Sequence, residues 1–102
     1  MNIAEEAKLR SEATRGMRAN ELMSDEIIVE AFTTLDQRLT NEWANSPARD
    51  TEGRERLWLM LKLLKSVEGH LKEVATTGKM AALKLEQERT LMQRAKQWAT
   101  EL

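Results

Sequence analysis

The sequence contains no cysteine, one histidine, one proline and four glycines in 102 residues. Without cysteine, the chain forms no disulfide and offers neither a thiolate ligand nor a cysteine nucleophile. No apolar run approaches the ~18 residues of a membrane-spanning helix. The segment from Met1 to Glu6 has no basic stretch followed by an apolar one. We therefore expect a chain that is neither secreted nor inserted in a membrane.

The patterns of common catalytic sites are also missing. His70 is the sole histidine, and Val67 stands where a Glu-x-x-His metal motif requires glutamate. The glycines are isolated, so no phosphate-binding loop and no Gly-x-Ser-x-Gly elbow occurs. Carboxylate pairs such as Glu5-Glu6 fall at expected helix starts or on polar faces, where water solvates them. We expect no enzymatic activity, no cofactor and no metal.

Helix-forming residues dominate what the chain does contain. Alanine, leucine, glutamate, lysine, arginine, methionine and glutamine are abundant, and β-branched residues never alternate with polar ones over a strand length. The composition predicts an all-α protein with a single helical domain over residues 1–102. Helices are expected at about residues 2–23, 25–45, 51–77 and 79–101. Ser24 is the expected N-cap of the second helix.

The second and third segments predict an antiparallel helical hairpin. In residues 25–45, apolar side chains recur at steps of four, three, four and four, which places them on one stripe. In residues 57–64, seven of eight side chains are apolar, which indicates the centre of the core. The expected packing residues of the hairpin are Phe32, Leu35, Leu39, Trp43, Leu57, Trp58, Met60, Leu61 and Leu64.

The only proline marks the turn of this hairpin. Pro47 disfavours helix at the preceding residue, so the second helix should end near residue 45. Asp50 or Thr51 can cap the third helix, and Arg49 or Arg54 can bond the last carbonyls of the second.

No proline follows residue 47, so one helix could extend almost to the end of the chain. Gly78 favours a break instead, since glycine commonly ends helices. Both a continuous helix and a kinked one remain open at this stage. Two heptad positions support continuity over part of the segment. They are occupied by Leu57, Leu64 and Leu71 and by Met60, Val67 and Val74.

The near-zero net charge hides an uneven distribution. Residues 21–45 contain one basic and six acidic side chains, and residues 79–102 contain five basic and three acidic ones. The acidic second helix is either solvated or meets a basic partner. Trp98 stands nearly alone near the C-terminus and suits an intermolecular contact. The candidate interface residues are Glu26, Glu30, Asp36, Leu91, Trp98 and Leu102.

Two arginine-rich clusters raise the question of nucleic-acid binding. Both are interleaved with acidic residues, and the pI of about 5.9 lacks the usual basic signature. Binding to nucleic acid is therefore an alternative that the sequence does not favour. The clusters are Arg49, Arg54 and Arg56, and Arg89, Arg94 and Lys96.

Several segments carry a resemblance to a known class of proteins. They are Glu30-Ala31-Phe32, Leu35, the run from Trp43 to Trp58, and Thr77-Gly78-Lys79. Together they cover about the middle half of the chain, which resembles small helical proteins encoded by tailed bacteriophages and prophages. The resemblance implies a phage-encoded protein of the bacterial cytoplasm or the virion, with a role in particle assembly or genome packaging. It supplies no functional residues.

Extended helices with uncovered apolar stripes predict a homo-oligomer. We expect a non-enzymatic assembly protein, a component of phage morphogenesis or of the virion, whose partners are other copies and other phage or host proteins. A DNA-packaging or regulatory nucleic-acid-binding module is one alternative. A small inhibitor that binds a host protein through its acidic second helix is the other.

Overall fold

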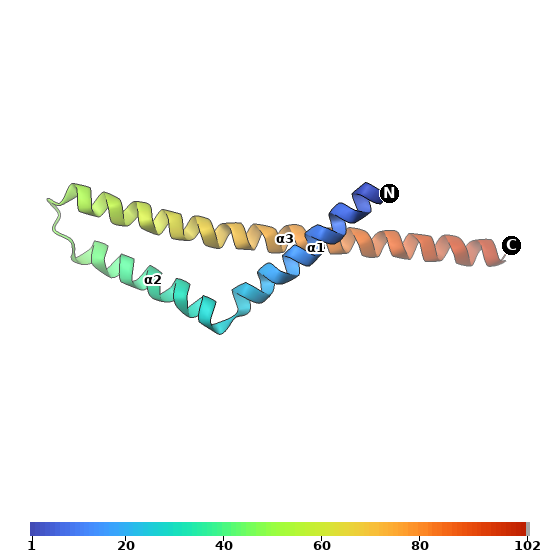
Figure 1. Cartoon of the computed structure of the whole chain (residues 1–102), viewed down its shortest axis with the longest axis horizontal. Helices are drawn as coiled ribbons and strands as arrows, with labels where there is room; N and C mark the ends of the chain where they lie inside the picture. Colours follow the sequence, from blue (N-terminus) through green and yellow to red (C-terminus); the bar gives the residue numbers. More distant parts are fainter. Residues whose placement is uncertain (102) are drawn as a thin grey trace. The chain divides into compact units, whose positions relative to one another are not determined.

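The protein is described by a computed structural model that covers residues 1–101. These residues form three helices, α1 (Ile3–Ser24), α2 (Glu26–Asn45) and α3 (Thr51–Glu101), with no strand among them (Figure 1). The predicted all-α fold is confirmed, with a hairpin of α2 and α3, a flanking N-terminal helix and a long C-terminal helix. Leu102, a predicted interface residue, lies outside the described residues.

A single non-helical residue separates α1 from α2. The Asp25 carboxylate accepts hydrogen bonds from the backbone N–H groups of Ile27 (2.9 Å) and Ile28 (3.1 Å), so Asp25 is the N-cap of α2. Ser24 is the last residue of α1, and the prediction that it caps α2 is wrong. An ionised carboxylate satisfies two free N–H groups and complements the positive end of the helix dipole better than a hydroxyl does.

The turn between α2 and α3 is held by Arg54. Its guanidinium donates to the carbonyl oxygens of Trp43 and Ser46, both at 3.2 Å, and to the Ser46 hydroxyl at 2.9 Å. It also stacks on the Trp43 ring, 4.2 Å from the ring centroid. These contacts satisfy carbonyls that the end of α2 leaves without helical partners. Arg54, rather than the exposed Arg49, therefore fastens the turn.

The start of α3 is capped by Asp50 and not by Thr51. The Asp50 side chain accepts a hydrogen bond from the Gly53 N–H at 3.1 Å, and its own N–H donates to the Pro47 carbonyl at 3.0 Å. Thr51 is the first residue of α3. Pro47 thus belongs to a short turn, and Asp50 links this turn to α3 through its backbone N–H and its side chain.

The helix that begins at Thr51 continues through Gly78 to Glu101 without interruption. The boundary predicted between residues 77 and 79 is wrong, and the alternative of a continuous helix is right. A glycine inside a helix costs about 1 kcal/mol relative to alanine. Here that cost is offset by a close contact that only glycine permits.

The chain packs as two compact units. Unit 1 contains Met1–Asn20 and the part of α3 that begins at Glu73. In this unit the backbones of α1 and α3 are in direct contact. A Cβ added to Gly78 would lie only 2.5 Å from the Cα of Gly16. Small buried residues surround this contact. They are Ala19, Ala75 and Ala81.

Unit 2 contains Glu21–Lys72, in which α2 packs antiparallel to the first part of α3. One predicted heptad position of α3 is half-buried in the hairpin (Leu57, Leu64 and Leu71), as are Phe32, Leu39 and Leu61. Within the hairpin the other predicted position is wrong, because Met60 and Val67 are 53% and 46% exposed. The neighbouring position, with Leu61 and Glu68, is turned toward α2 instead. The third residue of the predicted position, Val74, belongs to unit 1 and is half-buried.

The buried core differs from the predicted one. Among the described residues, no apolar side chain larger than alanine is buried. Trp58 and Met60 are about half exposed, Leu35 is 44% exposed and Trp43 is 39% exposed, so the prediction that residues 57–64 form the centre of the core is wrong. A helix that is apolar nearly all round needs neighbours on several sides, and one partner helix covers only one of them.

Candidate interaction surfaces

No cluster with metal-site geometry is present in residues 1–101. They contain no cluster of three or more histidine, cysteine or acidic side chains with metal-site geometry, and no buried polar or charged residue. Nor is any described helix long and apolar enough to cross a membrane. His70 is exposed. A hydrogen bond from Arg89 (2.6 Å) and its positive charge lower the pKa of Glu86, but both side chains are on the surface.

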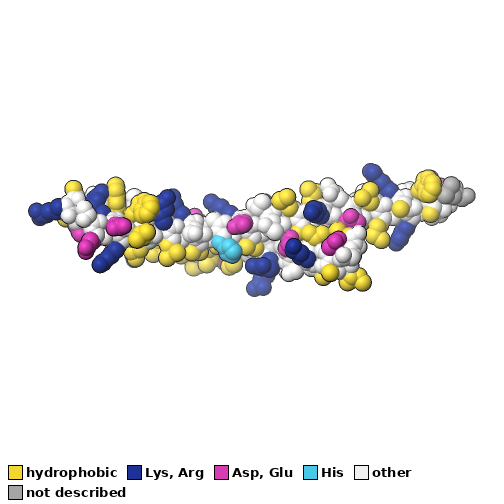
Figure 2. Space-filling model, turned by 90° about the horizontal axis from the view of Figure 1, so that it is seen from above, with side chains coloured by type: hydrophobic (Ala, Val, Ile, Leu, Met, Phe, Trp, Pro, Cys, Tyr) yellow, Lys and Arg dark blue, Asp and Glu magenta, His cyan; other side chains and the backbone are white. Residues whose placement is uncertain are grey.

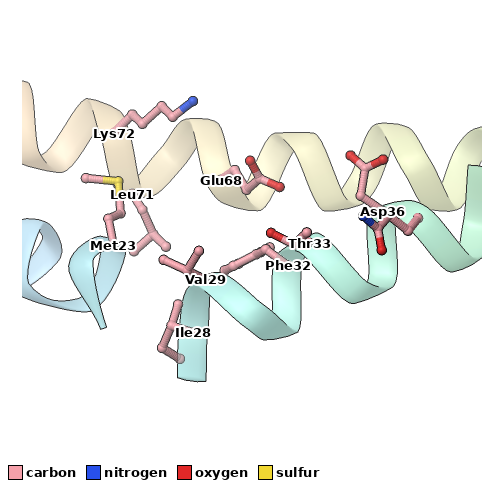
Figure 3. A pocket seen from close by; sticks show the side chains of 10 residues that line it. Met23, Ile28, Val29, Phe32, Thr33, Asp36, Glu68, Leu71 and Lys72 are labelled. Atoms are coloured by element: carbon pink, nitrogen blue, oxygen red, sulfur yellow. The ribbon is translucent and has the colours of Figure 1, made fainter. Parts of the chain in front are cut away.

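Unit 2 has a groove on one flank of the α2–α3 hairpin (Figure 3). Its volume is about 460 Å³. Met23, Val29 and Leu71 gather at one end of the groove, and Asp36 lies toward the other (Figure 3). The remaining lining residues include Phe32, Thr33, Glu68 and Lys72.

The predicted interface residue Asp36 lies in this groove and is half-buried. Its carboxylate accepts a hydrogen bond from the Thr40 hydroxyl at 3.2 Å. The other two acidic candidates, Glu26 and Glu30, are exposed and do not line the groove. The acidic residues of α2 therefore do not form one site.

The opposite flank of the same hairpin exposes apolar side chains to a greater degree. On α2 they recur every four residues, and on α3 they recur at steps of three and four, so each set lies along one side of its helix. Exposure reaches 69% for Ile27 and 67% for Leu63. Hydrophobic side chains are also visible at the surface in Figure 2. We call this set the apolar flank: Ile27, Ala31, Leu35, Met60, Leu63 and Val67.

In unit 1, the last part of α3 is exposed along its length. Every residue from Leu91 to Glu101 is exposed, including the predicted interface residues Leu91 (59%) and Trp98 (65%). An isolated helix of this length is marginal in water without a packing partner. This stretch is thus a second surface that another molecule could cover.

One arginine of each arginine-rich cluster is engaged in a contact within its own unit. Arg54 is used by the turn and Arg89 pairs with Glu86. Arg49 and Arg56 are exposed near the start of α3, whereas Arg94 is near its end.

The contact of Gly16 with Gly78 is the structural feature that sequence reasoning missed. A signal for it exists in the spacing, because small residues recur every three positions at Ala75, Gly78 and Ala81. Such a stripe lets two helix backbones approach closely, as small residues do in other tightly packed helix pairs. By propensity alone, Gly78 indicates a weak point of the helix rather than a contact surface.

Comparison of the chain with family models, with curated proteins and with solved structures finds no match. Function is therefore inferred from the residues and geometry of the chain itself.

Proposed function

We propose that this chain is a non-enzymatic helical assembly protein that works as an oligomer of itself. The observation that carries the proposal is the burial pattern. Among the described residues, eighteen large apolar side chains are exposed and no side chain larger than alanine belongs to the buried apolar set. Monomeric soluble proteins seldom leave so much apolar surface in water, and extended apolar patches mark interaction sites.

The size of the chain supports the same conclusion. A domain of this length must bury most of its apolar surface to be stable, because the free energy of unfolding of a small domain is small. Here each helix of a pair covers only one side of the other. Other copies of the chain can supply the missing cover, as in obligate homodimers, which often have no stable folded monomer.

Thermal unfolding over a wide range of protein concentrations tests this proposal. If folding and association are linked, the midpoint Tm rises with concentration because mass action favours the associated state. A Tm that does not change with concentration would contradict the proposal. A titration with random duplex DNA at several salt concentrations adds a control, because an assembly protein should show no steep salt-dependent binding.

The biological setting that we propose follows from the resemblance to phage-encoded helical proteins. In that setting the chain is a virion component or a morphogenesis factor. The presence of the protein in purified particles would support a virion role. Its presence only in the lysate during assembly would support a morphogenesis role, and absence of any association with particle proteins would contradict both.

A further inference from the structure

We propose that the apolar flank of unit 2 is the docking site for a second copy of this chain, with two hairpins packed in parallel so that their turns lie at the same end. The result is a four-helix bundle related by a two-fold axis that runs along the hairpins. This inference rests on the proposed self-association and adds the surface, the partner and the orientation.

The six residues of the apolar flank lie on the same side of the hairpin. The groove on the other flank shows which sides of the two helices are neighbours, since Val29 and Thr33 of α2 line it together with Lys72 of α3. Ile27, Ala31 and Leu35 lie around α2 on the other side of its contact with α3. Met60, Leu63 and Val67 have the same relation to the contact on α3, so the two sets share one flank.

The two sets also lie at matching heights along the hairpin. Arg54 contacts Trp43 near the turn, and Phe32 lines the groove with Glu68 further along. Because α2 and α3 are antiparallel, Leu35 lies at about the height of Leu63. The apolar flank is therefore one continuous surface and not two separate stripes.

Three charged residues, Arg38, Glu42 and Arg56, lie on this flank toward the turn. Arg38 follows Leu35 by three residues and precedes Glu42 by four, so it lies on the same side of α2. Glu42 follows Leu35 by seven residues and Arg56 precedes Leu63 by seven, so each occupies the same side of its helix as that leucine. Both are exposed, and the ion pairs found within residues 1–101 involve neither of them. The flank thus ends in one acidic and one basic side chain at the same height.

This charge pattern favours a second copy in the parallel orientation. A two-fold axis along the hairpins places α2 of one copy over α3 of the other at the same height. Glu42 then meets the partner's Arg56, and the same pair forms again on the other side of the axis. Leu35 and Ala31 meet the partner's Leu63 and the partner's Val67, whereas Arg38 lies one helical turn from Glu42, at about the height of the partner's Met60. An isologous contact requires such self-complementarity.

The antiparallel orientation lacks this match. It would set the charged end of each flank over the apolar end of the other, where Ile27 and Val67 lie. Charges desolvated against apolar side chains without partners are costly. Electrostatic complementarity of the parallel arrangement therefore fixes the register as well as the partner.

A matched pair of substitutions on α3 tests the docking site. Leu63 and Leu83 are 67% and 60% exposed on the same helix, and only Leu63 belongs to the apolar flank. Leu63→Glu should raise the dissociation constant of the oligomer by about a hundredfold or more, since each contact loses a buried leucine and gains a buried charge. Leu83→Glu should leave this constant within about threefold of the wild-type value, a difference of less than about 0.7 kcal/mol.

Sedimentation of the full-length variants gives the dissociation constants, and far-ultraviolet circular dichroism checks that each variant is helical. Equal effects of the two substitutions, with the wild type associated, would overturn the docking site and leave the proposed self-association in place. A wild type that stays monomeric would overturn both.

A charge exchange tests the orientation. Glu42→Arg and Arg56→Glu should each weaken association, and an equimolar mixture of the two variants should form a heterodimer in preference to either homodimer. In that heterodimer the arginine introduced at position 42 of one variant faces the glutamate introduced at position 56 of the other. The unchanged Glu42 and Arg56 form the second pair, so both contacts join opposite charges. A mixture without preferred pairing would show that the two residues do not meet across the interface.

Because the chain has no cysteine, a single introduced cysteine can show whether the turns of two copies lie close together. Ala48→Cys lies in the turn, so a short bis-maleimide should join two copies in the parallel arrangement. In the antiparallel one the turns stand about 30 Å apart, the length of a 20-residue helix. Absence of cross-linking in an associated sample would contradict the parallel orientation.

Discussion

Replacement of Gly78 by alanine is the sharpest probe of the contact between α1 and α3. A Cβ at this position would lie 2.5 Å from the Gly16 Cα, 2.8 Å from the Glu12 carbonyl oxygen and 3.0 Å from the Gly16 nitrogen. All three are backbone atoms, so no side-chain rotation can relieve the overlap. Carbon atoms pack at about 3.5–4.0 Å. The two helices must therefore move apart by about 1 Å.

Two effects of opposite sign contribute to the change in stability. Alanine is favoured over glycine inside a helix by about 1 kcal/mol. Overpacking of a tight contact costs about 1–3 kcal/mol, and the upper part of that range applies where the backbone is the obstacle. We expect a net loss of about 1–2 kcal/mol for Gly78→Ala.

Gly69 supplies the matched control, because it lies in the same helix and a Cβ there would meet nothing within 4 Å. Gly69→Ala should therefore raise the stability by about 1 kcal/mol. For a chain of this size, 1 kcal/mol shifts the Tm by about 4–8 °C. Thermal unfolding at one fixed protein concentration should show Tm changes of opposite sign. A rise in Tm for both variants would refute the backbone contact.

Further substitutions test the cap, the turn and the groove. Asp25→Ala should lower the stability by about 1 kcal/mol, measured by urea unfolding, because two backbone N–H groups lose their acceptor; no change would mean that water replaces the cap fully. Arg54→Lys should cost about 1–2 kcal/mol, since lysine cannot both bond the carbonyls and stack as arginine does. The same change at the exposed Arg49 should have an effect within about 0.5 kcal/mol, and equal effects would contradict the assigned role of Arg54. Val29→Ala should shift the dissociation constant of the oligomer by less than about threefold, because Val29 lines the groove and not the apolar flank, and a larger shift would place the groove in the interface.

The helices themselves follow from local sequence, which is why most of the fold could be predicted. Pro47 and the acidic caps set the ends of α2 and the start of α3, and the stripe of Phe32 and Leu39 selects the face that α2 turns toward its partner. These features depend on neighbours in sequence. Periodicity of 3.6 residues and cap chemistry are therefore enough to find them.

The continuity of α3 through Gly78 and the packing of α3 could not be predicted from local sequence. Gly78 is a helix breaker by propensity, and only the approach of Gly16 from a distant part of the chain explains its place inside a helix. Met60 and Leu61 are both apolar and adjacent, so the sequence alone does not decide which one is turned toward α2. Where a helix is apolar nearly all round, tertiary partners choose the buried side.

Some residues of the candidate surfaces were chosen from the sequence, and others were not. Trp98 and Leu91 are exposed, and their role as contact residues stays a prediction. The apolar flank includes Leu35 and Met60, which the sequence pattern assigns to the core. Their apolar character is evident from the sequence, whereas the partner that covers them is not. A single chain and an oligomer of the same chain make identical demands on an amphipathic pattern, so periodicity cannot distinguish them.

Sedimentation equilibrium of the wild-type chain tests the central claim most directly. The monomer mass is 11.7 kDa, and we expect a mass of at least twice that value that falls toward the monomer only on strong dilution. A folded, fully helical species that keeps the monomer mass at every concentration would contradict the claim that other copies of the chain cover its apolar surfaces.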